Sequence, residues 1–457
     1  MSGRSDIARS AGGVGAITMA SRIAGFLRDA VVSHLFGAGA VTDAFNIAFT
    51  IPNLFRRLLA EGALSIALVP VFSQYEATKT ETERKRLHDS TLSAMAAVLA
   101  VVTVAGVVLS PLVVKLFAPG FLRDQFALAV KLNRIMFPYL FCVGIASFFV
   151  AIMNARKSFL LPASSPIVLN FAIIACAIGL HYFLHPPIMA LALGVFAGGV
   201  LQAVLMFTAA GRAGYRPSPR WEPGHPDVKK MALLLLPATL GIAIYQINVM
   251  VSRALASFLP KASITYIYLS DRLFELPLGV FAVAVATVSL PALSEMSAKK
   301  EWDRYRDTIS FAMRLTLFIC VPAMVGLMVL RVPVISLLFQ HGAFTAKNTA
   351  ECAAVVLTAL AGIWAVAGTR NLAQGFYALK DTKTPVKVAF WAFVVNAACS
   401  LLLMSPLGAP GLTLANSISS AFNFLALAWL LSRKVGGWGQ RRVATSGLKS
   451  LAAALMM

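Results

Sequence analysis

The sequence predicts an all-α polytopic membrane protein with two six-helix lobes, and three observations support this class. Hydrophobic residues make up 58% and charged residues 13% of the 457 residues, with a mean hydropathy of +0.77. Soluble domains are about half apolar and about a quarter charged. Apolar segments of about 20 residues, the length that crosses a bilayer as a helix, recur along the chain. Several motifs also return 221 residues later or close to that spacing.

Twelve apolar segments, separated by short polar or Pro/Gly-containing breaks, define the expected spans. Each is long enough to cross the hydrocarbon core as a helix. A shorter apolar tail at 445–457 leads us to expect the beginning of a thirteenth span, with the C-terminal helices truncated. The expected spans are residues 9–37, 43–74, 90–117, 126–154, 160–182, 187–211, 230–257, 263–295, 307–330, 348–378, 385–405 and 410–432.

Internal repetition predicts how these spans are grouped. Four motifs return in the same order, each six spans after its first copy. The chain therefore divides into two halves of six spans each. An even number of spans per half makes the halves parallel, related by a pseudo-two-fold axis along the membrane normal, with a site between them near mid-membrane. The predicted domains are an N-terminal lobe (1–220), a C-terminal lobe (221–435) and the start of span thirteen (436–457). The motif pairs are LVPVFSQYEA and SLPALSEMSA, DSTLSAM and DTISFAM, LFAPGF and LFQHGAF, and ARKSFLLP and ALKDTKTP.

The formal charge of +21 could indicate a nucleic-acid ligand, so the positions of the basic residues decide its meaning. Alternate connections between the spans, together with the two ends, hold 24 Lys and Arg, whereas the other connections hold five. The positive-inside rule then places the N-terminus and the end of span twelve in the cytoplasm. The basic excess therefore indicates membrane topology, and we expect no nucleic-acid partner.

Three spans carry charges within their apolar sequence. An ionised group at the centre of a spanning helix costs about 2.5–3.5 kcal/mol, so such clusters should face a wet cavity or paired partners. One interpretation is structural ion pairing: Arg57 and Glu61 are four residues apart on a helix, and Arg28 and Asp29 would pair with neighbouring residues. The other is an anion site, because arginine grips phosphate bidentately. The charged positions are Arg22, Arg28 and Asp29 in span one, Arg56, Arg57 and Glu61 in span two, and Asp271, Arg272 and Glu275 in span eight.

Other kinds of site have weaker support. The sequence contains no phosphate-binding G-x-x-x-x-G-K-[ST] loop, no G-x-S-x-G elbow and no H-E-x-x-H motif, so we expect a transporter rather than an enzyme. His181 and His185 have the spacing of a helical metal pair, but no third ligand is near, and we expect no metal. GVFAG at 194–198 is a small-xxx-small motif that favours close helix packing.

Several motifs together resemble the MurJ (MviN) family, the lipid II flippases of the multidrug/oligosaccharidyl-lipid/polysaccharide (MOP) exporter superfamily. They are SRIAGFLRDAVV, GAGAVTDAFNIAF, PNLFRRLLAEGALSIALVPVF, DRLFELPLGVFAVAVATVSLPALS and DTKTPVK. The resemblance covers essentially the whole chain. It implies the MOP exporter fold, V-shaped with a central cavity. It also implies a multi-pass protein of the bacterial cytoplasmic membrane that moves undecaprenyl-pyrophosphate-linked peptidoglycan precursor from the inner to the outer leaflet.

The resemblance also implies roles for individual residues. The cavity arginines of the family match Arg22, Arg28, Arg56 and Arg272. Gating or charge-network positions match Asp43, Glu61, Asp271 and Glu275, with Arg57 and Asp29 in the same network. The expected partners are lipid II, membrane lipids and the cell wall synthesis machinery, with a monomeric chain and no cofactor. The sequence leaves the driving force open: a bound monovalent cation, the membrane potential or both would reset the cycle.

Two alternatives remain open from the sequence. One is another exporter of the same superfamily, acting on a drug or a lipid-linked polysaccharide unit. The other is a scaffold of the envelope machinery that transports nothing. A scaffold would tolerate neutral replacement of the arginines, provided that the protein still folds. Accumulation assays with cationic drugs, or assays of glycan export, would identify another exporter.

Overall fold

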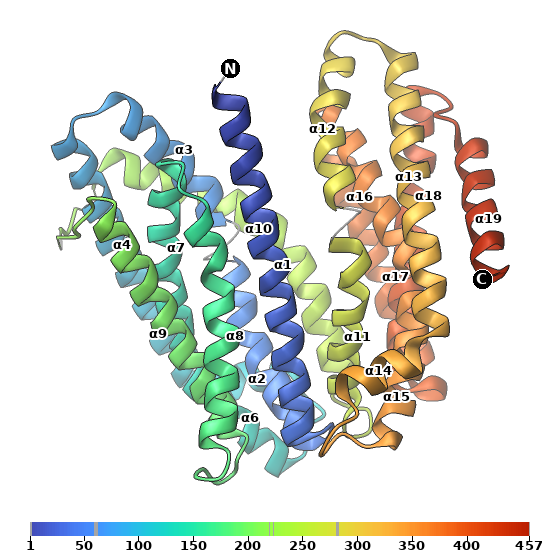
Figure 1. Ribbon diagram of the computed structural model, residues 1–457, viewed down its shortest axis with the longest axis horizontal. Coiled ribbons are helices and arrows are strands. Elements are labelled where there is room, and N and C mark those ends of the chain that lie inside the picture. Colours follow the sequence, from blue (N-terminus) through green and yellow to red (C-terminus); the bar gives the residue numbers. More distant parts are fainter. Residues whose placement is uncertain (1, 59–62, 219, 223, 280–282, 457) are drawn as a thin grey trace. The chain divides into compact units, whose positions relative to one another are not determined.

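The computed structural model describes residues 2–58, 63–218, 220–222, 224–279 and 283–456. These residues form helices joined by turns and short connections, with no strand among them (Figure 1). The predicted all-α class is confirmed. The helices are α1 (Ser2–Phe36), α2 (Ala40–Arg56), α3 (Ala63–Thr78), α4 (Glu81–Val108), α5 (Ser110–Phe117), α6 (Arg123–Met136), α7 (Tyr139–Ala155), α8 (Leu160–Leu180), α9 (Met189–Arg212), α10 (Pro226–Ala256), α11 (Ser263–Pro277), α12 (Val283–Ala298), α13 (Trp302–Val329), α14 (Arg331–Phe339), α15 (Ala346–Leu360), α16 (Ile363–Ala378), α17 (Lys383–Leu407), α18 (Ala409–Val435) and α19 (Gln440–Met456).

Eight helices or helix pairs in the described part are long and apolar enough to cross a membrane. They correspond to predicted spans three to six and nine to twelve: α4, α6 with α7, α8, α9, α13, α15 with α16, α17 and α18. The other four predicted spans fall on α1, on α2 with α3, on α10, and on α11 with α12, and they stay predictions. Three of these four carry the charges that lower their mean hydropathy.

Several predicted spans are divided between two helices where the sequence suggested continuous ones, and in spans three and four a proline lies at the division. Span three consists of α4 and α5, which meet at Leu109, and Pro111 lies in the first turn of α5. Span four consists of α6 and α7, with Phe137 and Pro138 between them. Proline has no N–H for the helical ladder, and its ring clashes with the preceding turn. It therefore starts a new helix more easily than it continues one.

The helix order of the first half returns in the second half. Helix α4 begins at Glu81 and α13 at Trp302, which is 221 residues later. A widened, π-type turn follows α2 at Arg57–Leu58, and another follows α11 at Leu278–Gly279, again 221 residues later. The repeated motifs thus lie on elements of the same type and order.

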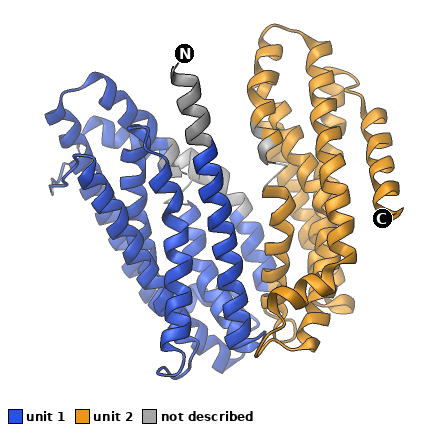
Figure 2. Ribbon diagram, in the orientation of Figure 1, with its two compact units in different colours: residues 1–254 blue, residues 255–457 orange. Residues whose placement is uncertain are grey.

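The chain separates into two compact units, Met1–Ala254 and Leu255–Met457 (Figure 2). All of helix α10 but its last two residues belongs to the first unit in this division, although its position in the sequence matches the first helix of the second repeat. The lobe boundaries at 220 and 435, the separate segment 436–457 and the pseudo-two-fold relation stay predictions.

Helices α8 and α9 pack closely through the GVFAG motif of the first unit. A Cβ atom added at Gly194 would lie 2.8 Å from the Cα of Ile173, and one at Gly198 would lie 3.2 Å from the Cα of Leu169. Only glycine permits this backbone approach, so the predicted packing role is confirmed.

We expect Gly194→Ala to destabilise the protein by about 1–3 kcal/mol, because α8 must move to admit the methyl group. The measurement is thermal unfolding in detergent. Gly179→Ala on α8 is the matched control, since a Cβ there meets no atom within 4 Å. Equal unfolding temperatures for the two variants would contradict this account of the packing.

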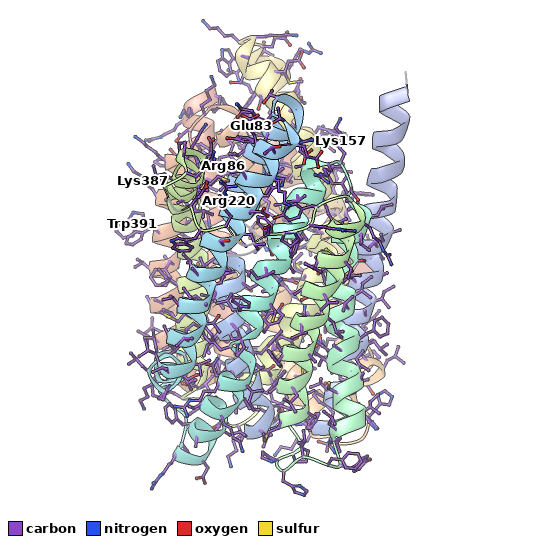
Figure 3. The ribbon with its side chains drawn as sticks, turned by 90° about the vertical axis from the view of Figure 1, so that its left-hand side faces the viewer. Glu83, Arg86, Lys157, Arg220, Lys387 and Trp391 are labelled. Carbon is purple, nitrogen blue, oxygen red and sulfur yellow. The ribbon has the colours of Figure 1, made fainter. Side chains whose placement is uncertain are left out.

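The predicted cytoplasmic charges of the first unit gather at one end of its helices. Arg86, Lys157 and Arg220 lie in the same half of that unit (Figure 3). Lys85, next to Arg86 at the start of α4, is exposed. This arrangement agrees with the predicted topology, in which that end faces the cytoplasm.

The orientation can be tested by cysteine labelling in intact cells. We expect Lys85→Cys to resist a membrane-impermeant thiol reagent added outside and to react once the membrane is permeabilised. Lys347→Cys is the comparison, because its side chain is 85% exposed and the topology places it outside. Labelling of position 85 from outside would reverse the assignment.

Candidate functional site

Arg28 and Asp29 of α1 form a buried ion pair inside the first unit. The residues are 6% and 4% exposed. The Arg28 guanidinium donates to Asp29 Oδ1 from Nε at 3.0 Å and from Nη2 at 2.6 Å. Its Nη1 donates to Oδ1 of Asn170 on α8 at 3.0 Å. The ion-pair interpretation considered for these two residues therefore describes their geometry in this structure.

Arg56 and Arg22 are more accessible than Arg28. Both are half-buried, and Arg56 donates from Nε to the Asn53 side-chain oxygen at 2.7 Å. Arg56 and Arg28 both lie close enough to act electrostatically on the buried hydroxyl of Tyr139, at the start of α7. The first unit thus places Arg28 of α1 and Arg56 of α2 near the beginning of α7.

Asp43, one acidic position of span two, lies at the opposite end of α2 from Arg56. Asp43 is 2% exposed and lies in the first turn of α2, where a carboxylate interacts favourably with the helix dipole. Thirteen residues separate it from Arg56, which is about 20 Å along a helix. Arg57 is exposed at the end of α2, and Glu61 lies outside the described residues.

In the second unit, Arg272 of α11 is held by a tyrosine one turn earlier. Its Nε and Nη2 donate to the Tyr268 hydroxyl at 3.2 and 2.9 Å, and its guanidinium lies 5.1 Å from the centroid of that ring. Arg272 is half-buried, whereas Asp271 and Glu275 are exposed. Tyr268 is neutral, so the contact orients the guanidinium while leaving its charge uncompensated by that residue.

The chain matches known proteins over nearly its whole length. Residues 32–457 match the family model described as lipid II flippase MurJ. The chain is 37% identical over 423 residues to the probable lipid II flippase MurJ of Vibrio cholerae, covering 91% of this chain and 81% of that protein. It is 35% identical over 456 residues to the Haemophilus influenzae protein of the same description, covering 96% and 89%. This chain belongs to the MurJ family.

Solved structures agree with the assignment to the MurJ family. A lipid II flippase MurJ in an inward closed conformation superposes with a TM-score of 0.82 at 27% identity, covering 97% of this chain and 91% of that one. An inward-facing multidrug MATE transporter of the MOP superfamily superposes with a TM-score of 0.74 at 13% identity, covering 95% and 98%. The second likeness shows a shared fold, and the predicted MOP exporter fold is confirmed.

Four further arginines of this MurJ family member lie within predicted spans, outside the charge clusters that the sequence interpretation considered: Arg134, Arg253, Arg314 and Arg370. Arg253 of α10 is 8% exposed, and Arg370 of α16 is half-buried and acts electrostatically on the buried thiol of Cys320. The cost of a charge inside a span could have identified all four. They were missed because only clusters of several charges were weighed.

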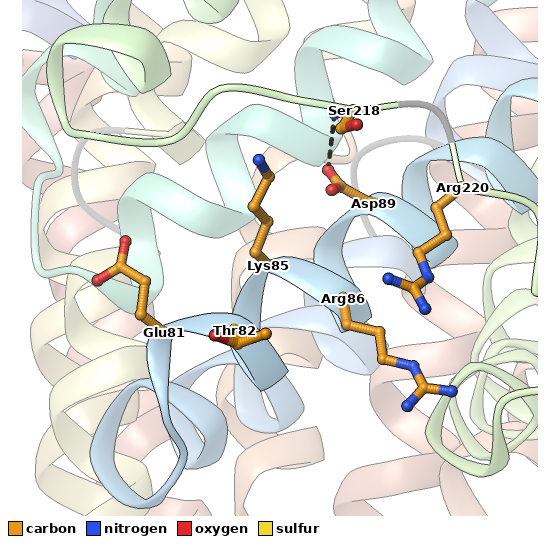
Figure 4. A pocket seen from close by; sticks show the side chains of 7 residues that line it. All are labelled: Glu81, Thr82, Lys85, Arg86, Asp89, Ser218 and Arg220. Atoms are coloured by element: carbon orange, nitrogen blue, oxygen red, sulfur yellow. Dashed lines mark hydrogen bonds between the residues drawn. The ribbon is translucent and has the colours of Figure 1, made fainter.

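A polar pocket lies where α4 begins, beside the connection from α9 to α10 (Figure 4). Asp89 accepts hydrogen bonds from the Tyr215 hydroxyl at 2.8 Å and the Ser218 amide at 3.0 Å. Burial and this bond to Asp89 raise the pKa of the Tyr215 hydroxyl. The lining residues are Glu81, Thr82, Lys85, Arg86, Asp89, Ser218 and Arg220.

The basic side chains of this pocket are balanced by acidic ones. Glu222 accepts from Arg86 at 2.9 Å and from Arg220 at 2.6 Å. Hydrogen bonds from Arg86 and Arg220 lower the pKa of the Glu222 carboxyl. The pocket therefore secures the connection between α9 and α10 to α4, and its charge balance does not favour an anionic ligand.

A related ionic cluster joins the ends of three helices outside the predicted spans. Glu76 of α3 binds Arg84 of α4 and Arg156 at the end of α7, each at 2.8 Å. Burial acts to raise the pKa of the Glu76 carboxyl, but hydrogen bonding and the charges of Arg156 and Arg84 lower it overall. This cluster stabilises the first unit at the end that holds its basic residues.

Proposed function

We propose that this protein is a lipid II flippase of the bacterial cytoplasmic membrane. It moves the undecaprenyl-pyrophosphate-linked peptidoglycan precursor from the inner to the outer leaflet by alternating access, supplying cell wall biosynthesis and so maintaining cell shape. Membership of the MurJ family supports the substrate class. The chain spans 81% and 89% of the first two relatives, so most of their length is represented.

The observation that carries the proposal is the set of arginines within otherwise apolar spans. Arg56 and Arg272 are half-buried, and the contacts described for them go to the neutral side chains of Asn53 and Tyr268. The planar fork of a guanidinium matches two phosphate oxygens, which suits these arginines to a pyrophosphate. The proposed substrate-binding residues are Arg22, Arg28, Arg56 and Arg272, and the proposed gating network is Asp43, Glu61, Asp271, Glu275, Arg57 and Asp29.

The proposed cycle makes and breaks no covalent bond, so the protein acts as a transporter rather than an enzyme and uses no cofactor. Its N-terminus is cytoplasmic, and it works as a monomer among membrane lipids, beside the cell wall synthesis machinery. The membrane potential or a monovalent cation resets the empty transporter. In proteoliposomes, imposing a potential or a cation gradient separately distinguishes these two sources.

Depletion of the protein in its host tests the function directly. An externally added enzyme that cleaves lipid II reaches only precursor in the outer leaflet. We expect the cleavable fraction to fall as the protein disappears, while total lipid II rises. Accumulation of a cationic dye should not change, which separates this function from drug export. An unchanged cleavable fraction after complete depletion would contradict the proposal.

A further inference from the structure

Asn170 of α8 contacts one of the proposed binding arginines from a different helix. It is 7% exposed, and its Oδ1 accepts a hydrogen bond from Arg28 Nη1 at 3.0 Å. Its Nδ2 donates to the backbone oxygen of Ser21 at 3.5 Å. We propose that Asn170 is a positioning residue for Arg28 in lipid II binding, an inference that rests on the proposed function.

The two neighbours of the Asn170 amide determine its orientation. A guanidinium can only donate hydrogen bonds, and a backbone carbonyl can only accept them. The amide oxygen must therefore face Arg28 and the amide nitrogen must face Ser21. A leucine of similar size could make neither bond, and a carboxylate could make only the first.

Helix α1 presents one face to Asn170. Ser21, Gly25 and Arg28 are spaced by four and three residues, so they lie on the same side of the helix. A Cβ atom at Gly25 would lie 3.8 Å from Asn170 Nδ2, which is ordinary contact distance. Asn170 thus binds α1 at Ser21 and Arg28, about two turns apart, and fixes the direction in which Arg28 extends.

The charge around Arg28 explains why an amide suits this position. Asp29 already supplies one carboxylate to the guanidinium. A second carboxylate at position 170 would add a further negative charge beside Arg28 and would repel a pyrophosphate. A neutral acceptor orients Arg28 without removing more of its positive charge, and at low dielectric such a difference acts over several ångströms.

Binding of purified lipid II to the detergent-solubilised full chain tests the inference. We expect Asn170→Leu to weaken binding by roughly 10-fold, the effect of losing one hydrogen bond to a charged group. Asn170→Asp should bind still more weakly because of the added negative charge. The double variant Asn170→Asp with Asp29→Asn restores one carboxylate and one amide around Arg28, and should recover most of the affinity lost in Asn170→Asp.

Asn133 provides a matched control in the same unit. It is a fully buried asparagine whose amide bonds the Ala48 carbonyl at 3.1 Å and the Ser110 hydroxyl, and no bond to an arginine is described for it. Asn133→Leu should lower the unfolding temperature, because two buried hydrogen bonds are lost. The folded variant should still bind lipid II with wild-type affinity. A purely structural Asn170 would behave like Asn133.

The outcomes separate this inference from the proposed function. If the wild-type chain does not bind lipid II, the proposed function fails. If it binds and Asn170→Leu binds equally well, only the positioning role fails. If Asn170→Leu does not accumulate, Asn170→Asp and the double variant decide: equal affinities for these two would overturn the inference, because exchanging amide and carboxylate would then have no effect.

Discussion

Arg28→Ala is expected to prevent normal accumulation of the protein. The substitution removes the guanidinium that donates two hydrogen bonds to Asp29, which is 4% exposed. Breaking a buried ion pair by removing one partner costs about 3–5 kcal/mol, because the remaining charge stays in a poorly solvated place. That is a large fraction of the total stability of about 5–15 kcal/mol typical of proteins. The measurements are membrane protein level and thermal unfolding in detergent.

A second substitution identifies the cause of the Arg28→Ala defect. Neutralising the carboxylate in the double variant Arg28→Ala with Asp29→Asn should recover much of the protein level, although lipid II translocation stays low. Lys79→Ala, which removes an exposed pair with Glu83 at 3.3 Å, should have little effect. Normal level and unfolding temperature for Arg28→Ala alone would show that the pair contributes little to stability.

Arg56→Ala and Arg272→Ala are expected to abolish translocation while leaving the protein level close to normal. Both side chains are half-buried, so their truncation disturbs the interior less than truncation of the buried Arg28, but it removes the fork proposed to hold the pyrophosphate. Arg→Lys at either position keeps the charge and loses the bidentate geometry, so activity should be reduced rather than restored. The readouts are growth complementation and the outer-leaflet fraction of lipid II.

An exposed arginine controls for the general loss of positive charge. Arg304 is 72% exposed and pairs with Glu301, so Arg304→Ala should complement fully. Full activity of both Arg56→Ala and Arg272→Ala at normal protein level would refute the proposed binding role. Full rescue by lysine at both positions would instead indicate a requirement for charge alone.

Removal of Arg28 is expected to lower the protein level, whereas removal of Arg56 or Arg272 is expected to lower translocation. The sequence alone does not distinguish these arginines. From the sequence, Arg28, Arg56 and Arg272 are equivalent: each is an arginine inside an apolar span, with acidic residues nearby. In the structure, Arg28 is a buried partner of Asp29, whereas Arg56 and Arg272 are half-buried. Burial and partner choice depend on how α1 packs against α8, which no local pattern encodes.

The sequence by itself determined the helical class, most span positions, the repeat of elements and the existence of costly charges within spans. All of these follow from local properties: segment hydropathy, the length of a helix that crosses a bilayer, and the cost of an ion in it. Only the tertiary structure decided which charges are paired and what holds them. Arg28 and Asn170 are 142 residues apart in the chain and meet at 3.0 Å. Such a contact arises from the packing of two helices, because hydrogen-bond partners must meet in space and not in sequence.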